Sequence, residues 1–139
     1  MKVPMHAVLL AYARRHGLEP LQARSDGGLA VVVDGLYRVL LVPAPDGCLA
    51  MTSVLLDLGV VRESRRADCL SGLASLAAGL LRDHPSALAL DAGGDRLLLQ
   101  QVRTVLSQPD WLEDELAEFI NALAFWRRAA DQAIQRWSA

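Results

Sequence analysis

Histidine is the residue type in this chain best suited to bind a metal ion or to move protons, and its positions argue against either role. His6 and His16 lie ten positions apart, one near each end of a short predicted helix, and His84 stands before Pro85 in a distant segment. A zinc ion needs its ligand atoms within about 2.0–2.3 Å, and nothing in the sequence gathers these three side chains. We therefore predict no metal site.

Motifs for covalent catalysis and for cofactor binding are also missing. The sequence has no GxSxG elbow, no glycine-rich phosphate loop, no HExxH pair and no dinucleotide fingerprint. Gly93-Gly94 falls in a predicted turn between two strands, where backbone geometry accounts for glycine. Ser71 and His84 are too far apart along one predicted helix to act as nucleophile and base. We expect no cofactor, and a small enzyme is the least favoured function.

Four carboxylates, Glu113, Asp114, Glu115 and Glu118, crowd the start of the longest predicted helix. Such a cluster could serve acid–base catalysis or metal binding, but acidic side chains are also favoured near a helix N-terminus because they complement the helix dipole. Glu113 follows Asp110 by three positions, which is the spacing of a capping box. We interpret the cluster as a solvated helix start.

This helix is predicted to run from Asp110 to Trp137, directly after Pro109. Its apolar residues recur at steps of three and four, which lays one apolar stripe along about seven turns that can cover a face of a sheet. Trp111 and Trp126 are expected in the core or at its edge, as is Trp137, with partner contact as the alternative. The stripe consists of Leu112, Leu116, Phe119, Ile120, Leu123, Ala130, Ile134 and Trp137.

Short apolar runs joined by tight turns predict antiparallel hairpins in the middle of the chain. A first helix follows Pro4 and is expected to end at Gly17 in a Schellman cap. Asp-Gly pairs then separate the runs, and this dipeptide is a strong hairpin signal because the turn needs residues that tolerate positive φ. The predicted strands span residues 21–24 (weakly), 29–33, 36–42, 48–56, 87–91 and 96–102.

A second helix is predicted from Ser64 to Asp83, and one of its flanks has almost no side-chain bulk. Ser71, Ser75 and Gly79 recur there every four residues. Small residues let another backbone approach closely, whereas each glycine costs about 0.8–1 kcal/mol relative to alanine. Two interpretations stay open: the flank packs against the domain's own sheet, or it makes a helix-to-helix contact across a dimer.

Together these elements predict one α+β domain over residues 1–139. It has an antiparallel twisted sheet of about five strands and three helices, in the order α-β-β-β-α-β-β-α. The apolar share is 53% and the mean hydropathy is +0.24. This surplus of apolar side chains suggests an interface with a subunit, a peptide or a ligand.

Charge and composition exclude several partners. The net charge is −2 and the arginines are scattered, so we expect no nucleic acid. No apolar run approaches the ~18–20 residues that span a bilayer, and Pro4 and His6 interrupt the N-terminal run where a secretory signal would be continuous. We expect a cytoplasmic chain without stable membrane insertion. Cys48 and Cys69 form no CxxC pair and are expected to be small core hydrophobes in a reducing compartment.

The element order, the size, the acidic pI and the ending LAEFINALAFWRRAADQ resemble the class I chaperones of bacterial type III secretion, the CesT-like family. The resemblance covers nearly the whole chain. Within that family, the segment RDHPSALALDAGGDRLLLQ at 82–100 looks like the YscB-type subunit, and His84-Pro85-Ser86 stands where many members carry Asn and Gly. This second resemblance implies pairing with a SycN-type chaperone and binding of the secretion gatekeeper protein.

The family resemblance implies a non-enzymatic chaperone that uses no nucleotide. It implies a dimer, of two copies or with a SycN-type partner, formed by the second helix and the neighbouring strand. With the small-residue flank included, the expected interface residues are Leu70, Leu73, Ser75, Ala77, Gly79, Leu80, Leu88 and Leu90. The cargo would be an unfolded N-terminal segment of a secreted protein, lying in grooves of the first helix and first strands. By position, the cargo contacts would be Val8, Leu9, Tyr12, Val31, Val33, Leu40 and Met51.

The leading hypothesis is therefore a cytoplasmic type III secretion chaperone, associated with virulence, that keeps its cargo competent for protein transport. The alternative is a dimeric α+β regulatory module that binds a small apolar ligand or another protein. A deep enclosed pocket with convergent polar groups would favour the alternative, whereas shallow apolar grooves along an open surface would favour the chaperone.

Overall fold

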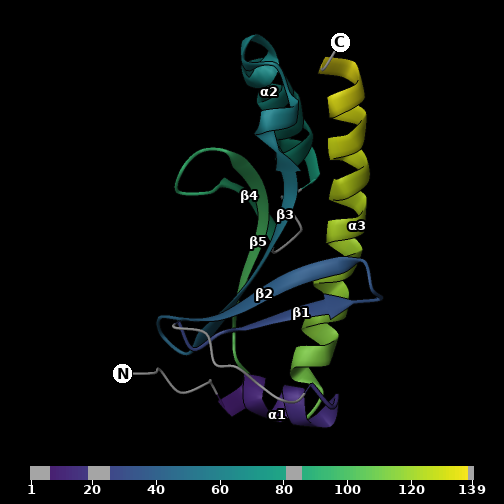
Figure 1. The fold of residues 1–139 in the computed structure, drawn as a ribbon. Helices are drawn as coiled ribbons and strands as arrows, with labels where there is room; N and C mark the ends of the chain where they lie inside the picture. The colour runs from purple at the N-terminus through teal and green to yellow at the C-terminus, as the bar shows by residue number, and fades with distance from the viewer. Residues whose placement is uncertain (1–6, 19–25, 81–85, 138–139) are drawn as a thin grey trace.

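The computed structural model describes residues 7–18, 26–80 and 86–137, and it confirms the expected fold class and element order. Features expected at residues 21–24, at Pro4 and at Pro85 lie outside the described residues, as do His6 and His84. The elements, drawn in Figure 1, are α1 (Ala7–Arg15), β1 (Leu29–Val33), β2 (Tyr37–Ala44), β3 (Cys48–Asp57), the 3-10 turn η1 (Leu58–Val60), α2 (Glu63–Leu80), β4 (Ser86–Leu90), β5 (Arg96–Thr104) and α3 (Trp111–Trp137).

The five strands form one antiparallel sheet in the order β1-β2-β3-β5-β4. Two of its turns use the predicted Asp-Gly pairs. The φ angles are 56° at Asp34 and 64° at Gly35, and they are 63° at Asp46 and 71° at Gly47. Glycine is unhindered in this left-handed region and aspartate tolerates it. The turn residues therefore determine where the first two hairpins reverse.

The central strand β3 changes its neighbours along its length. Its pairing with β2 ends at Leu40 opposite Thr52, whereas its pairing with β5 continues to Asp57 across a bulge between Val54 and Leu56. Bulges increase the local twist of a sheet. The β1-β2 hairpin consequently turns away from β3 and β5, which Figure 1 shows as two ribbons crossing the rest of the sheet.

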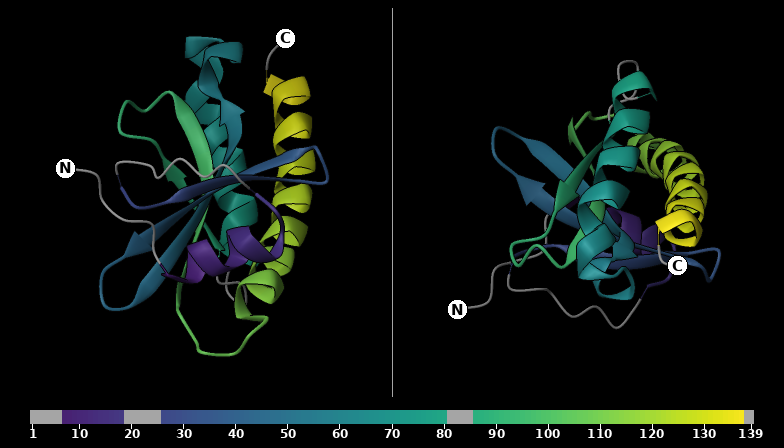
Figure 2. Two further views of the ribbon diagram at one scale, coloured as in Figure 1. Left: turned by 60° about the horizontal axis from the view of Figure 1, so that its bottom comes forward. Right: turned by 90° about the horizontal axis from the view of Figure 1, so that it is seen from above.

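The core lies between one face of this sheet, here called the inner face, and the helices. Helix α3 confirms the predicted long stripe, and it lies side by side with α2 in Figures 1 and 2. Trp111 and Trp126 are buried in the core, as expected; the side chain of Trp137 lies outside the described residues. The buried residues of the inner face are Leu29, Val31, Val39, Leu41, Leu49, Met51, Ser53, Leu56, Ser86, Leu97, Leu99 and Gln101. Those of α3 are Trp111, Leu112, Leu116, Phe119, Ile120, Ala122, Leu123, Trp126 and Ala130.

Helix α1 ends in the predicted Schellman cap. The backbone N–H of Leu18 donates to the carbonyl of Ala13 at 2.9 Å, and that of Gly17, whose φ is 63°, donates to Arg14 at 3.4 Å. This pair of bonds satisfies carbonyls that the helix end would otherwise leave free. Leu9 and Ala13 are fully buried, so α1 belongs to the same core as α3.

An ionic clamp joins the end of α1 to the start of α3. Oε1 of Glu113 accepts a hydrogen bond from Nε of Arg15 at 2.9 Å and lies 3.3 Å from Nε2 of His16. The expected capping box is therefore wrong, because Glu113 points to α1 and its buried Oε2 has no hydrogen-bond partner. Partial burial raises the pKa of Glu113, but bonds from Arg15, its own backbone and His16 outweigh it, so the net pKa is lowered.

A buried polar chain ties β4 and β5 to α3. The hydroxyl of Ser86 donates to Oε1 of Gln101 at 3.1 Å, and the amide of Gln101 donates to Oε2 of Glu115 at 3.1 Å. Arg103 donates to the same Glu115 oxygen at 3.2 Å. Glu115 is thus a bonded residue and not part of a freely solvated helix start. Because Gln101 is only 1% exposed, its amide has no access to water as a substitute partner.

Replacing Gln101 with Met should lower the free energy of unfolding by about 1–3 kcal/mol, because the substitution keeps the volume and leaves the buried Ser86 hydroxyl unpaired. Urea unfolding followed by circular dichroism measures the change. Gln100→Met on the neighbouring outward-facing position is the matched control, expected within about 0.5 kcal/mol of wild type. Equal losses of unfolding free energy in the two variants would show that the polar chain does not stabilise the fold.

Replacing Glu113 with Gln should destabilise the fold at pH 7 by no more than about 1 kcal/mol, because the clamp is partly exposed. The lowered pKa of Glu113 determines how this stabilisation depends on pH. The stabilisation is present above the ordinary glutamate pKa of about 4.3, and it is lost as the pH falls through the lower pKa of the folded state. The difference between wild type and Glu113→Gln should therefore shrink in acid. Urea unfolding over a pH series tests this, with exposed Asp114→Asn as the control for the helix dipole; a gap that persists or widens in acid contradicts it.

Candidate protein-binding surface

The sheet face opposite the core, here called the open face, is apolar and is not buried by any described residue. Directly paired residues share a face of a sheet, and the pairs Ala30 with Leu40, Leu40 with Thr52, and Val54 with Leu98 all point away from the core. Every side chain of this set is half-buried or exposed. The ladder also places the charged Arg38 and Arg96 on this face. Its uncharged members include Ala30, Val32, Leu40, Val42, Ala50, Thr52, Val54, Ala87, Ala89, Leu98, Gln100 and Val102.

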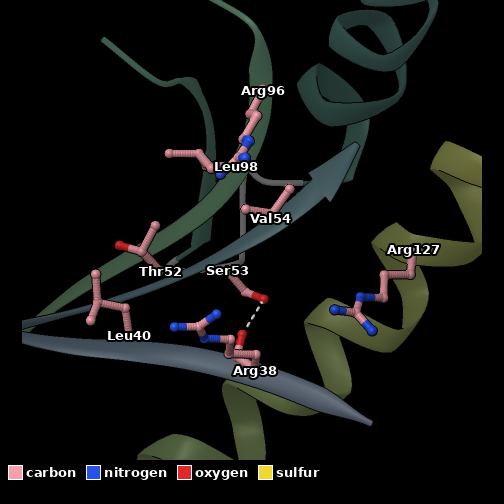
Figure 3. A pocket seen from close by; sticks show the side chains of 8 residues that line it. All are labelled: Arg38, Leu40, Thr52, Ser53, Val54, Arg96, Leu98 and Arg127. Atoms are coloured by element: carbon pink, nitrogen blue, oxygen red, sulfur yellow. Dashed lines mark hydrogen bonds between the residues drawn. The ribbon is translucent and has the colours of Figure 1, made fainter. Parts of the chain in front are cut away.

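An open groove of about 390 Å³ lies where β2 and β3 separate. Beyond Leu40 and Thr52 the two strands share no ladder pair, and a single bond from the Ser53 hydroxyl to the carbonyl of Arg38, 2.6 Å long, bridges the gap. Figure 3 shows this bond with the lining side chains around it. The lining comes from β2, β3, β5 and α3 and comprises Arg38, Leu40, Thr52, Ser53, Val54, Arg96, Leu98 and Arg127.

A second open groove, of about 350 Å³, lies between α1, the end of β1 and the first half of α3. It brings together Tyr12 and Val33 from the predicted cargo set, with Leu116 and Ile120 below them. Burial, followed by the charge of Glu113, raises the pKa of Tyr12 against the opposing effect of Arg15, so the phenol is neutral at pH 7. This groove can offer an apolar wall and a hydroxyl to a bound chain.

The predicted cargo residues fall into two groups of different accessibility. Leu9 and Met51 are fully buried, and Val31 is 5% exposed, so these three support the core from inside. Tyr12 is buried apart from its edge at the second groove. Val8 lines a third, smaller groove beside Trp111, Val33 lines the second and Leu40 lines the first. A cargo role for the set stays a prediction, and only its outer members can be touched without opening the core.

The predicted dimer residues also differ in their burial. Leu73 and Ala77 are buried against the core, and Leu70 and Leu88 are partly buried there. Leu90 is 50% exposed, and the side chain of Leu80 lies outside the described residues.

The small-residue flank of α2 is uncovered. Ser71, Ser75 and Gly79 are exposed, and a Cβ atom placed on Gly79 would meet no atom within 4 Å. The interpretation that this flank packs against the domain's own sheet is therefore wrong. A contact across a dimer stays a prediction.

The residues of the described ranges form no recognisable catalytic constellation. No group of three or more His, Cys, Asp or Glu side chains is placed to hold a metal ion, and no helix there is long and apolar enough to cross a membrane. Cys69 is fully buried, which raises the pKa of its thiol, but Cys48 is only half-buried and lies beside Thr104 at the sheet's end. The expectation of a core position is thus wrong for Cys48.

The arginines of the first groove were missed by the sequence reasoning. Arg38 alternates with Val39 along β2, so strand periodicity would have placed it on the face opposite the core. Arg96 and Arg127 come from distant segments, and no local pattern joins them to Arg38.

Known structures share this architecture. One chain of the ExsC-ExsE complex matches with a TM-score of 0.67 at 20% identity, covering 87% of this chain and 89% of that one. A chain of the HopA1-SchA chaperone-effector complex matches with a TM-score of 0.61 at 18% identity, covering 87% and 91%. A third match is the Yersinia pestis type III secretion chaperone SycH in complex with a stable fragment of YscM2, at 0.56 and 21%, covering 86% and 97%. At these identities the likeness establishes the fold.

Sequence comparison identifies the family. No curated protein matches the chain. Residues 8–127, however, match the Tir chaperone protein (CesT) family, and this range includes every strand and most of the three helices. Because the match extends over most of its 139 residues, the chain belongs to the CesT family of type III secretion chaperones.

Proposed function

We propose that this chain is a non-enzymatic cytoplasmic chaperone that binds the N-terminal segment of a secreted protein and keeps it competent for type III secretion. The match of residues 8–127 to the CesT family carries the proposal. Structural relatives solved in complex with an effector or with a fragment of another protein support it. The chaperone would act by binding and release, without nucleotide.

The surface chemistry suits an extended, unfolded ligand. The sheet has an apolar open face and, among the described elements, two edge strands, β1 and β4. An extended segment can hydrogen-bond to such an edge through its backbone while alternate side chains enter apolar grooves. Ordering a disordered segment costs about 2–5 kcal/mol of the gross interaction energy, so the affinity per buried area stays modest. Such binding holds the cargo unfolded and still allows its release.

The shapes of the grooves favour this function over the regulatory alternative. A small apolar ligand needs a concave site that buries most of its surface. The grooves described here are open to solvent, and two of them are lined by both apolar and charged side chains. Their form fits side chains of a chain that runs across the surface.

We further propose that the chain acts as one subunit of a dimer joined through α2. Its exposed flank at Ser71, Ser75 and Gly79 would allow a second helix to approach closely. Exposed Leu76 and Leu90 lie on α2 and β4 and would be covered in the same contact. The partner proposed from the YscB-type resemblance is a SycN-type chaperone, and the cargo is then the gatekeeper protein.

Co-expression with a tagged N-terminal segment of the gatekeeper, with and without the SycN-type partner, tests the function. We expect a stable complex by affinity capture followed by size-exclusion chromatography with light scattering. The matched control is the same segment with its aliphatic residues replaced by Ser, which should not be retained because apolar burial drives the association.

Absence of a complex in both arms would contradict the proposal. Capture of another secreted protein's N-terminal segment in place of the gatekeeper's would refute the gatekeeper assignment and support the general chaperone function.

Replacing Gly79 with Leu tests the proposed dimer. A Cβ atom added there meets no atom of the described chain within 4 Å. Glycine is about 0.8–1 kcal/mol less favourable in a helix than alanine, and leucine ranks just below alanine. We therefore expect equal or higher helix content by circular dichroism together with a fall in solution mass toward the monomer. Ala74→Leu is the control, because it is exposed on α2 but lies about 140° around the helix from Gly79. An unchanged mass for Gly79→Leu would show that the flank is not the interface.

A further inference from the structure

The groove between β2 and β3 combines an apolar floor with three arginines from different elements. Arg38 comes from β2, Arg96 from β5 and Arg127 from α3, and Figure 3 shows them around Leu40, Val54 and Leu98. Among the residues that the structure describes, no Asp or Glu side chain belongs to the lining. The groove is therefore a local positive site in a chain whose net charge is −2.

Two of these arginines have no partner within the part of the chain that the structure describes. Neither the guanidinium of Arg38 nor that of Arg96 makes a hydrogen bond or an ion pair there. Asp57, which stands opposite Arg96 in the ladder, is outside the lining and accepts a bond from the backbone N–H of Gly59. Each guanidinium keeps its five donors available for an incoming acceptor.

Arg127 has a different role in the groove. Its Nη1 donates to the carbonyl of Leu36 at 3.2 Å, and its guanidinium lies 5.1 Å from the centre of the Tyr37 ring. These contacts hold its charge in a fixed place behind the gap between the strands. A fixed charge adds to the potential of the groove without the entropy cost of ordering a mobile side chain.

The chemistry of the lining specifies its ligand. A guanidinium matches a carboxylate through two parallel hydrogen bonds, and leucine and valine side chains on the floor suit aliphatic neighbours. An extended peptide places every second side chain on one face, about 6.5–7 Å apart. One carboxylate between two aliphatic side chains on the same face of a strand therefore fits both features.

We propose that this groove selects cargo segments that carry a glutamate or aspartate between aliphatic residues at alternate positions, with Arg38 and Arg96 binding the carboxylate. The inference rests on the proposed chaperone function and adds a sequence rule for the cargo. Apolar grooves alone would accept many unfolded chains, whereas a paired charge rejects those that lack the acid. Covering the groove with a bound strand removes water, which strengthens the ionic bonds.

The test uses two synthetic peptides, acetylated and amidated, in which Leu and Val alternate with Ser around one central Glu or one central Gln. Peptide affinity and the Arg side-chain Nε–Hε signals are followed by nuclear magnetic resonance on the labelled full chain. We expect the Glu peptide to bind about tenfold more tightly, the effect of one charged hydrogen bond of about 1.5 kcal/mol. It should shift the signals of Arg38 and Arg96, and the preference should weaken as salt rises.

The double variant Arg38→Gln with Arg96→Gln should bind both peptides equally, at the affinity of the Gln peptide for wild type. Its fold should be intact because both side chains are exposed. The matched control, Arg62→Gln with Arg128→Gln, removes the same charge from exposed positions outside the groove and should keep the preference.

Equal binding of the two peptides to wild type, no binding of either at millimolar concentration, or a preference that survives in the double variant would each overturn the proposal. Displacement of the Glu peptide by inorganic phosphate more readily than by acetate would overturn it too, because the groove would then be a phosphate site. Formation of the gatekeeper complex is measured in a separate experiment. If that complex forms but the Glu peptide binds no better than the Gln peptide, the proposed selection by Arg38 and Arg96 is refuted and the chaperone function is not.

Discussion

The buried stripe of α3 packs against the inner face of the sheet, and no described helix packs against the other. This asymmetry sets the properties of the whole surface. Phe119, Leu123 and Trp126 meet the inner-face leucines and valines, and burying each large side chain is worth about 1.5–3 kcal/mol. The open face has a similar share of aliphatic residues but gains nothing comparable from the described residues. Apolar surface left in this way favours association with another chain.

The divergence of β2 from β3 turns part of that open face into a shaped site. If β3 paired with β2 along its whole length, the ladder would fill the space now bridged by one bond from Ser53 to Arg38. The bulge between Val54 and Leu56 keeps β3 paired with β5 while the hairpin leaves. A guanidinium from α3 can then reach a space that also borders the open face. The groove is thus a product of sheet twist, which explains why its residues come from four elements.

The sequence predicted those parts of the molecule whose signals are local. The long period of α3 and the Asp-Gly pairs at 34–35 and 46–47 each specify an element without reference to anything distant, and these were confirmed. Glu113 was assigned to a capping box from spacing alone, but its real partners, Arg15 and His16, lie nearly a hundred positions away. For the strands, the sequence could not show which face of the sheet each residue occupies. A run such as LAVVV is apolar at every position, so periodicity could not show that Val31 points into the core and Val32 points out. One position changes the face of a strand residue, which is why several predicted cargo residues proved buried.

Helix α2 carries the observations behind the proposed dimer. Among the side chains of α2 that the structure describes, only Cys69, Leu73 and Ala77 are buried in the core. The helix also carries Gly72 and Gly79, each costing about 0.8–1 kcal/mol relative to alanine. The space beside Gly79 is open in the described chain, so no contact there compensates for that glycine. A partner helix against the flank would supply the missing contact, and any ligand that binds only the folded dimer would stabilise it further by mass action. Dimerisation and cargo binding would then be thermodynamically linked, because each contributes to the stability of the same fold.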